Sequence, residues 1–386
     1  KLRATVFTAA LFGSSAIALA GVPTDLPYPS GDLNGDQIIE QVYFVNHFYS
    51  MKNYAIVKDG KEITVLVNKV KDKKPTTVTL ERFLNNEYND GVIKARDLAI
   101  FRSGKLKGTG MLITDYVDDA KPQSYMIWLP ALRKIRRFAQ PAHDDSWGGT
   151  DFTFGDVSLR KPMHETHELL GKETFNDCLG AVDVPEDQRS RYTRNLPEAY
   201  CGAKGREVYK VKSTTKFENW WYDHRISYID AETFADYRTD YFKGGEKIKV
   251  IDRNWQSVDG IDDPRALRWG YWYGTTLDTG HETWAVIPDK ATRTNGDPAN
   301  GRTGYQGCAV GHTGPVDGKP CGKVIRAVQY HVCPRHLSRQ FLFIQAMIYQ
   351  LECAIRVQLL QCSGGGACLG LAKIGYPVDD LTLQVG

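Results

Sequence analysis

Alternating apolar and polar positions dominate the chain from residue 54 to 139 and again from 206 to 276. The first region contains short runs rich in β-branched and aromatic residues, such as AIVKDGKEITVLV, GMLITDYV and YMIWLP, separated by turn residues. Asp59-Gly60 and Gly244-Gly245 are strong signals for tight turns between strands. The pattern predicts a mainly β protein built from antiparallel strands.

One predicted hairpin has a strongly cationic second strand. Residues 125–138 read YMIWLPALRKIRRF, and Pro130-Ala131 interrupts the apolar run. The segment therefore predicts two paired strands, YMIWLP and KIRRFA. Alternation along the second strand puts Ile135 and Arg137 on one face, and Lys134, Arg136 and Phe138 on the other.

The second β region is expected to have one face rich in aromatic residues. In WWYDHRISYID, the residues that alternate onto one face are Tyr222, His224, Ile226 and Tyr228. In the next strand, Tyr237, Thr239 and Tyr241 share a face in the same way. A meander of this length is expected to curl around a helix, a packed core or a ligand.

Three segments interrupt the strand pattern. Residues 21–36 are rich in Pro, Gly and Asp and are typical of an extended leader, after which Asp36 is predicted to cap a helix through IIEQVYFVNHF. DLNGDQIIE imitates a calcium loop, but it lacks the required Gly and the final acid. Residues 141–165 are rich in Gly and Asp with embedded aromatics, which predicts a long ordered loop.

The first 20 residues, KLRATVFTAALFGSSAIALA, are typical of a secretory signal peptide, with Lys1 and Arg3 before an apolar stretch and an A-x-A cleavage site. The alternative is a buried N-terminal helix. Removing this peptide takes two of the 49 basic residues and none of the 46 acidic ones, so the mature charge is nearly balanced. We therefore expect a periplasmic protein of a Gram-negative bacterium that binds no nucleic acid.

The chain contains eight cysteines, which suggest disulfides in an exported protein. Cys178 and Cys201 flank a polar insertion and are predicted to form a bridge. The other six lie between 308 and 368, and the absence of any C-x-x-C pair argues against a zinc ribbon, a thioredoxin-type site or covalent haem. Residues 291–386 share neither the composition nor the periodicity of the rest, so they are either a disulfide-rich appendage or a shifted reading frame.

Motif searches give no catalytic constellation. The G-x-S-x-G elbow and the Walker-type loop are both absent. Residues 164–168 read HETHE, which is not H-E-x-x-H and has no evident third ligand, so a surface His pair is the better interpretation. We expect no metal site and no cofactor.

Several stretches together resemble the LolA/LolB-like family of outer-membrane lipoprotein-sorting proteins. The resemblance covers residues 37–290 and rests on GKLKGTGMLITDY, YMIWLPALRKIRRFA, the Gly-Thr-Asp-Phe of SWGGTDFTFGDV, REVYKVKSTTK, WWYDHRISYID and GYWYGTT. It implies an open, strongly curved antiparallel sheet, an incomplete β-barrel, with helices as a lid or plug. The insertion bearing Cys178 and Cys201 departs from that pattern.

The resemblance also implies a function, namely a non-catalytic, monomeric carrier of acyl chains from lipoprotein or free lipid. An inner-membrane exporter would be the donor and an outer-membrane protein the acceptor. The residues expected to line the apolar cavity or its lid are Leu112, Trp128, Leu129, Leu132, Ile135, Phe138, Trp147, Phe152, Phe154, Tyr222, Ile226, Tyr228, Tyr237 and Tyr241. Arg133, Arg136 and Arg137 are expected to contact phosphate headgroups or acids of the lid.

Two other classes of function stay open at this point. One is an envelope enzyme that acts on lipid or glycan. The other is a structural envelope protein whose curved sheet is filled by its own side chains, which a cavity too small for an acyl chain would favour.

Overall fold

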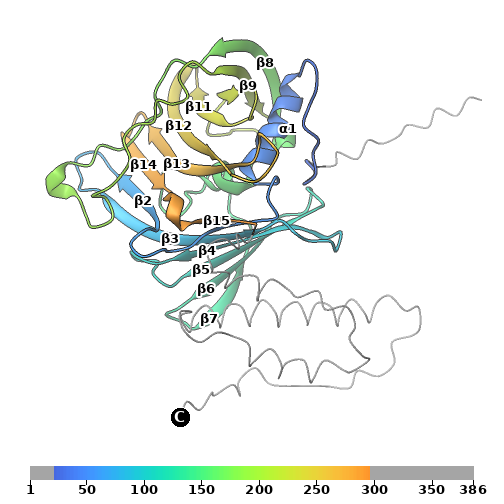
Figure 1. The fold of residues 1–386 in the computed structure, drawn as a ribbon. Helices are drawn as coiled ribbons and strands as arrows, with labels where there is room; N and C mark the ends of the chain where they lie inside the picture. The colour runs from blue at the N-terminus through green and yellow to red at the C-terminus, as the bar shows by residue number, and fades with distance from the viewer. Residues whose placement is uncertain (1–20, 296–386) are drawn as a thin grey trace, which may run out of the picture. The chain divides into compact units, whose positions relative to one another are not determined.

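The computed structural model describes residues 21–295, whose main element is one antiparallel sheet of 15 strands (Figure 1). Thirteen of these strands run in the order β7-β6-β5-β4-β3-β2-β14-β13-β12-β11-β10-β9-β8. Strands β7 and β8 form the two edges and do not pair with each other, so the sheet stays open. The predicted fold class, mainly β with an open curved sheet, is confirmed.

The strands are β1 (Asn53–Ile56), β2 (Thr64–Lys69), β3 (Thr76–Asn85), β4 (Ile93–Phe101), β5 (Gly110–Tyr116), β6 (Ser124–Leu129), β7 (Lys134–Phe138), β8 (Glu165–Thr174), β9 (Glu207–Thr215), β10 (His224–Asp230), β11 (Asp236–Lys243), β12 (Glu246–Ser257), β13 (Leu267–Thr276), β14 (His281–Val286) and β15 (Thr292–Thr294). The helical elements are α1 (Gly35–Asn46), the π-helical η1 (Gly155–Leu159), and the 3-10 turns η2 (Pro162–His164), η3 (Glu186–Gln188) and η4 (Asp289–Ala291). The signal-peptide prediction and nearly all of the predicted C-terminal segment lie outside the described residues.

Helix α1 begins two residues earlier than the sequence suggested. Asn34, and not Asp36, is its N-cap, because the Asn34 side chain accepts a hydrogen bond of 2.9 Å from the Gln37 amide. The Gln37 side chain accepts from the Asn34 amide in return, at 3.0 Å, which completes a capping box. Asp36 lies in the first turn, where a negative charge still favours the helix dipole.

The predicted cationic hairpin is confirmed. Strands β6 and β7 pair from Tyr125↔Phe138 to Leu129↔Lys134. Arg133, in the connecting turn, has a φ of +48°. The register also confirms that Ile135 and Arg137 share one face and that Arg136 and Phe138 share the other.

Strand β1 lies outside the main order of the sheet. Asp59-Gly60 does form a turn, closed by a bridge between Asp59 and Glu62, but β1 and β2 on either side of it do not pair. Strand β1 instead pairs with β3 and with β15. The described sheet therefore extends to Thr294, past the expected end of the sheet domain at residue 290.

The two faces of the sheet are covered by different segments. On one face, which we call the plug face, lie α1 and the connection between β7 and β8, residues 139–164; together we call them the plug. On the opposite face, the insertion face, lies the β8–β9 connection, residues 175–206. Bonds from this insertion include one of 2.6 Å from the Gly180 amide to Asp252 and one of 3.0 Å from the Tyr200 amide to the Tyr271 hydroxyl.

Candidate functional site

The plug face is divided into an apolar half and a charged half. The apolar half belongs to β2–β6 and contributes Leu66, Leu80, Phe101, Met111, Ile113 and Tyr125, which pack with Trp147 and Leu159 of the plug. Ring contacts join the two layers, with centroids 6.4 Å apart for Phe101 and Trp147 and 6.0 Å apart for Tyr125 and Phe154. This half buries apolar surface in the ordinary way.

The charged half belongs to β8–β12, where buried ion pairs replace apolar contacts. Asp156, in η1, accepts hydrogen bonds from Tyr241 at 2.6 Å, from Arg160 at 2.9 Å and from Lys249 at 3.2 Å. Burial alone would raise the pKa of Asp156, but Lys249, Arg160 and these hydrogen bonds hold it well below its usual range. Asp156 is therefore an anion shared by the plug and the sheet.

A second pair fixes the start of β8. Arg225 of β10 binds Glu165 in a fork, with contacts of 2.7 Å from Nη2 and 3.0 Å from Nε, and the Tyr222 hydroxyl donates at 3.0 Å. Burial opposes ionisation, but Arg225 lowers the pKa of Glu165 to about 2. Forked guanidinium–carboxylate pairs of this kind combine energy with a defined geometry.

A third pair connects α1 to the sheet. Arg253 of β12 donates to Asp236 at 2.7 Å, and Asn46 at the end of α1 donates to the same carboxylate at 3.1 Å. The Arg253 guanidinium also lies 4.2 Å from the ring centroid of Trp272. Helix α1 is therefore bound to the sheet by polar contacts as well as by its apolar face.

A fourth cluster lies outside the charged half, where the plug meets β4 and β5 beside the apolar half. Lys161 lies 2.8 Å from Asp119 and 3.9 Å from Asp115, and Lys94 lies 3.6 Å from Asp119. Burial raises the pKa of Asp115 and lowers that of Lys94. Lys94 also lies 5.6 Å from the ring centroid of Tyr43.

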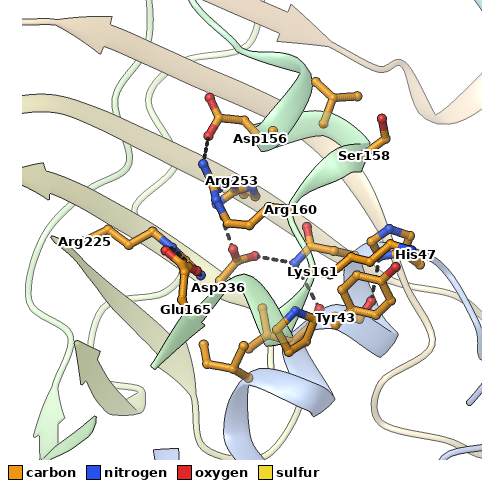
Figure 2. Close-up of a pocket in the computed structure, with 16 residues that line it drawn as sticks. Tyr43, His47, Asp156, Ser158, Arg160, Lys161, Glu165, Arg225, Asp236 and Arg253 are labelled. Atoms are coloured by element: carbon orange, nitrogen blue, oxygen red, sulfur yellow. Dashed lines mark hydrogen bonds and ion pairs between the residues drawn. The ribbon is translucent and has the colours of Figure 1, made fainter. Parts of the chain in front are cut away.

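A pocket of about 60 Å³ lies among these groups, between α1, residues 155–165 and strands β10–β12 (Figure 2). Figure 2 shows Tyr43 and His47 on the α1 side and Arg225, Asp236 and Arg253 on the sheet side. The Tyr43 hydroxyl and His47 Nε2 are buried and have no hydrogen-bond partner among the described residues. Burial lowers the pKa of His47 to about 3, so its ring is neutral at ordinary pH.

Neither pocket on the plug face is large enough for an acyl chain in this conformation. The second pocket, of about 120 Å³, is lined by residues that include Gln123, His143, Lys161 and His164. Ligand pockets usually measure roughly 300–1,000 Å³, whereas one water takes about 30 Å³. At these two places, the plug and the side chains of the sheet leave too little space for an acyl chain.

The residues predicted to line one cavity are divided between the two faces. On the plug face, or within the plug, lie Leu129, Phe138, Trp147, Phe152, Phe154, Tyr222 and Tyr241. The strand registers place Leu112, Trp128, Ile135, Ile226 and Tyr228 on the opposite face. The two groups cannot line a single cavity, and the ligand-binding role of each residue stays a prediction.

Two predicted tyrosines differ from the expected face pattern for local reasons. Tyr237 lies at an irregular step of the β10–β11 pairing, and its ring contacts Phe175 of the insertion, with centroids 5.7 Å apart. Tyr222 precedes β10, so it does not follow the alternation of His224, Ile226 and Tyr228.

The predicted basic residues lie at or beside the β6–β7 turn. Arg136 is on the plug face and Arg137 on the insertion face, and Arg133 and Leu132 are in the turn itself. All four side chains are exposed. Their contact with headgroups or a lid stays a prediction.

The predicted disulfide between Cys178 and Cys201 is confirmed. It closes the insertion, whose Leu179, Val182 and Val184 are buried in the larger core cluster. Arg238 of β11 donates to the carbonyl of Cys178 at 3.0 Å and to Asp177. The disulfide therefore closes the insertion, which covers the insertion face of the sheet.

Sequence reasoning missed the charged half entirely. Arg225, Lys249 and Arg253 occupy polar strand positions that the alternation pattern assigns to solvent. Asp156 and Glu165 fall in the segment 141–165, which is predicted to be a long ordered loop. The available signal was in β12, where KIKVIDRNW has no clean apolar face.

Among the described residues, no group of three or more His, Cys, Asp or Glu side chains could hold a metal ion. Within residues 21–295, no helix is long and apolar enough to cross a membrane.

Comparison with solved structures finds similar chains of the same β architecture. A putative outer membrane lipoprotein-sorting protein domain from Vibrio parahaemolyticus is 15% identical, with a TM-score of 0.49, and the match covers 70% of this chain and 95% of that one. A DUF1329 family protein from Desulfovibrio piger is also 15% identical, with a TM-score of 0.49 and coverage of 67% and 92%. A LolA superfamily protein from Nitrosomonas europaea is 10% identical, with a TM-score of 0.42 and coverage of 68% and 94%.

Comparison of the sequence with family models and with curated proteins gives one family match and no curated relative. A family described as "Uncharacterized protein" matches residues 94–196. A search of curated proteins gives no match.

Proposed function

We propose that this protein is a monomeric, non-catalytic periplasmic carrier that takes up an amphiphilic lipid or lipoprotein acyl chain when its plug moves away from the sheet. The observation that carries the proposal is the division of the plug face. An acyl chain would lie against the apolar half, β2–β6. A polar or anionic headgroup would lie beside the cations of the charged half.

The energetics of the apolar half suit such a ligand. Removing an acyl chain from water is worth about 0.8 kcal/mol per CH₂, or on the order of 10 kcal/mol for a C16 chain. Trp147 and Leu159 already cover this surface, so a chain that replaces them would exchange one apolar contact for another. The cost of opening would then be met mainly by the contacts that the chain makes.

The charged half would suit the polar headgroup of such a lipid. Arg160, Lys161, Arg225 and Arg253 line the 60 Å³ pocket together with the acids Asp156, Glu165 and Asp236. Each of the four cations already pairs with an acid, so an anionic headgroup would take the place of one of these acids. An inner-membrane exporter as donor and an outer-membrane protein as acceptor belong to the same proposal.

The first experiment is native mass spectrometry with lipid extraction on protein purified from the periplasm without detergent. A defined lipid or acyl-peptide at near-unit stoichiometry is the expected result. Empty protein that also fails to take up added lipid would overturn the proposal. Release of a chemically altered lipid, with turnover, would identify an enzyme instead.

A pair of variants tests the route of entry. Trp147→Ala removes a plug side chain that packs on the apolar half, and Phe175→Ala removes an aromatic ring of similar burial on the insertion face. Both should lower stability by about 3–5 kcal/mol. Only Trp147→Ala should speed the uptake of a fluorescent fatty acid. Equal uptake rates in the two variants would contradict entry beneath the plug.

A second candidate is a structural envelope protein with a self-filled sheet. The small volumes of the two pockets, about 60 and 120 Å³, favour it. The same uptake experiment separates the two candidates, because a purely structural protein would take up no lipid even after Trp147→Ala.

A further inference from the structure

Three alternate hairpin turns gather at one end of the sheet. They are residues 70–75 between β2 and β3, 102–109 between β4 and β5, and 130–133 between β6 and β7. Because these six antiparallel strands are neighbours in the order β7-β6-β5-β4-β3-β2, alternate turns lie at the same end. The β13–β14 turn, residues 277–280, joins them, since Glu282 pairs with Lys69 at that end. We call these four turns the cationic rim.

Each turn of the cationic rim exposes one aliphatic side chain. The exposed fractions are 40% for Val70, 39% for Leu106, 55% for Leu132 and 48% for Leu277. Single exposed aliphatic residues are ordinary on a protein surface. Val92, at 51%, and Val117, at 50%, are exposed in the turns at the other end as well, so the rim differs from that end in combining its aliphatic side chains with positive charge.

The same turns concentrate positive charge. The four turns of the rim contain seven lysine or arginine residues and two acids, Asp72 and Asp278, whereas the turns at the other end, 86–92 and 117–123, contain four acids and one lysine. Six of the seven cations are exposed and form no ion pair with any of residues 21–295: Lys71, Lys73, Lys74, Lys105, Lys107 and Arg133. The nearly neutral chain is thus polarised along its strands.

We infer that the cationic rim docks on an anionic phospholipid surface. Cations flanking short apolar side chains are the combination that binds the interface of such membranes, with the cations at the phosphates and the apolar groups among the upper acyl carbons. An acidic protein would use the cations but would leave the four separate aliphatic residues without a function. The acidic end would face away from the membrane and orient the molecule.

This inference is independent of the proposed carrier function, because it concerns the end of the sheet and not the space beneath the plug. Membrane docking can hold for a protein that carries no lipid. A carrier can also work without docking. A negative result for membrane docking therefore leaves the carrier function open, and a negative result for lipid uptake leaves docking open.

The test is flotation of the full chain with vesicles of phosphatidylcholine alone and of phosphatidylcholine mixed equally with phosphatidylglycerol. Binding is expected only to the anionic vesicles, and it should weaken at high salt. A rim variant, Lys73→Gln with Lys74→Gln, Lys105→Gln and Lys107→Gln, should lower the partition coefficient by about 10- to 100-fold. Leu106→Ser with Leu132→Ser should weaken binding even at low salt.

A matched control removes the same charge elsewhere. Lys58, Lys61, Lys204 and Lys290 are exposed and lie outside the cationic rim. Their joint replacement by Gln should leave vesicle binding within about twofold of the original. Circular dichroism confirms that each variant is folded. Equal losses in the rim and control variants, or no binding of the unchanged protein to anionic vesicles, would overturn the inference.

Discussion

The two halves of the plug face pack against the plug through different kinds of contact, apolar in one half and ionic in the other. In β2–β6 the sheet meets the plug through Phe101, Met111 and Ile113, whose contacts are non-directional. In β8–β12 it meets the plug through Asp156, which the Tyr241 hydroxyl and the Lys249 ammonium bind from the sheet. Apolar contacts tolerate small shifts, whereas a buried ion needs every partner in place. The difference teaches that the plug is held most specifically at its charged half.

The largest effect is expected from Asp156→Asn. The change keeps the shape but leaves Lys249 and Arg160 buried without their shared anion. Loss of one partner from such a cluster costs about 3–5 kcal/mol of the free energy of unfolding, which urea denaturation can measure. The exposed Asp144→Asn is the matched control, expected within about 0.5 kcal/mol of the original. A loss below about 1 kcal/mol would show that the charged half is not specific.

Acid should destabilise both the Glu165 ion pair and the buried, neutral His47. The pKa of Glu165 is lowered from 4.5 to about 2 in the folded protein, so its contribution is complete above pH 4.5 and falls away toward pH 2. The shift corresponds to stabilisation on the order of 3 kcal/mol. His47, with its pKa lowered from 6.5 to about 3, adds a loss that begins as pH falls below 6.5.

Two variants separate these acid effects. His47→Gln should flatten the loss of thermal stability between pH 6.5 and 4.5. The double change Glu165→Leu with Arg225→Met should remove part of the loss below pH 4.5 and should be close to neutral at pH 7, because both charges leave together. A pH profile that neither variant alters would assign the acid sensitivity to other groups.

The smallest effect is expected in the apolar half. Ile113→Val removes one buried methylene from the cluster of β2–β6 and should cost about 0.5–1.5 kcal/mol of the free energy of unfolding. Val92→Ala, at an exposed turn position, should change it by less than about 0.5 kcal/mol. A cost for Ile113→Val that equals that of Asp156→Asn would remove the contrast between the halves.

Local signals in the sequence predicted most of the sheet. Gly244-Gly245 gives a two-residue hairpin between β11 and β12, and both glycines have positive φ, as such turns require. Pro130-Ala131 interrupts the apolar run and so marks the β6–β7 turn. The Cys178–Cys201 bridge followed from its place at the ends of a polar insertion. Each of these features is decided by residues close together in the chain.

The charged half could not be predicted, because its partners are far apart in the sequence. Glu165 binds Arg225, 60 residues away, and Asp156 binds Lys249, 93 residues away. Alternation assigns polar positions to solvent, and nothing local indicates that the plug will cover them. Two nearby Asx residues made the start of α1 ambiguous between Asn34 and Asp36. A pairing irregularity, invisible in the pattern, displaced Tyr237.

The pairing of β2 with β14 and of β1 with β15 has a consequence for the order of folding. Val65 pairs with Val286, and Tyr54 with Thr294, so β1 and β2, which both pair with β3 on one side, find their second partners only in the last strands. Contacts of such sequence separation are slow to form, and until then β2 presents a bare strand edge. A chain interrupted before β14 would keep that edge, and we would expect it to aggregate rather than rest in a stable partial fold.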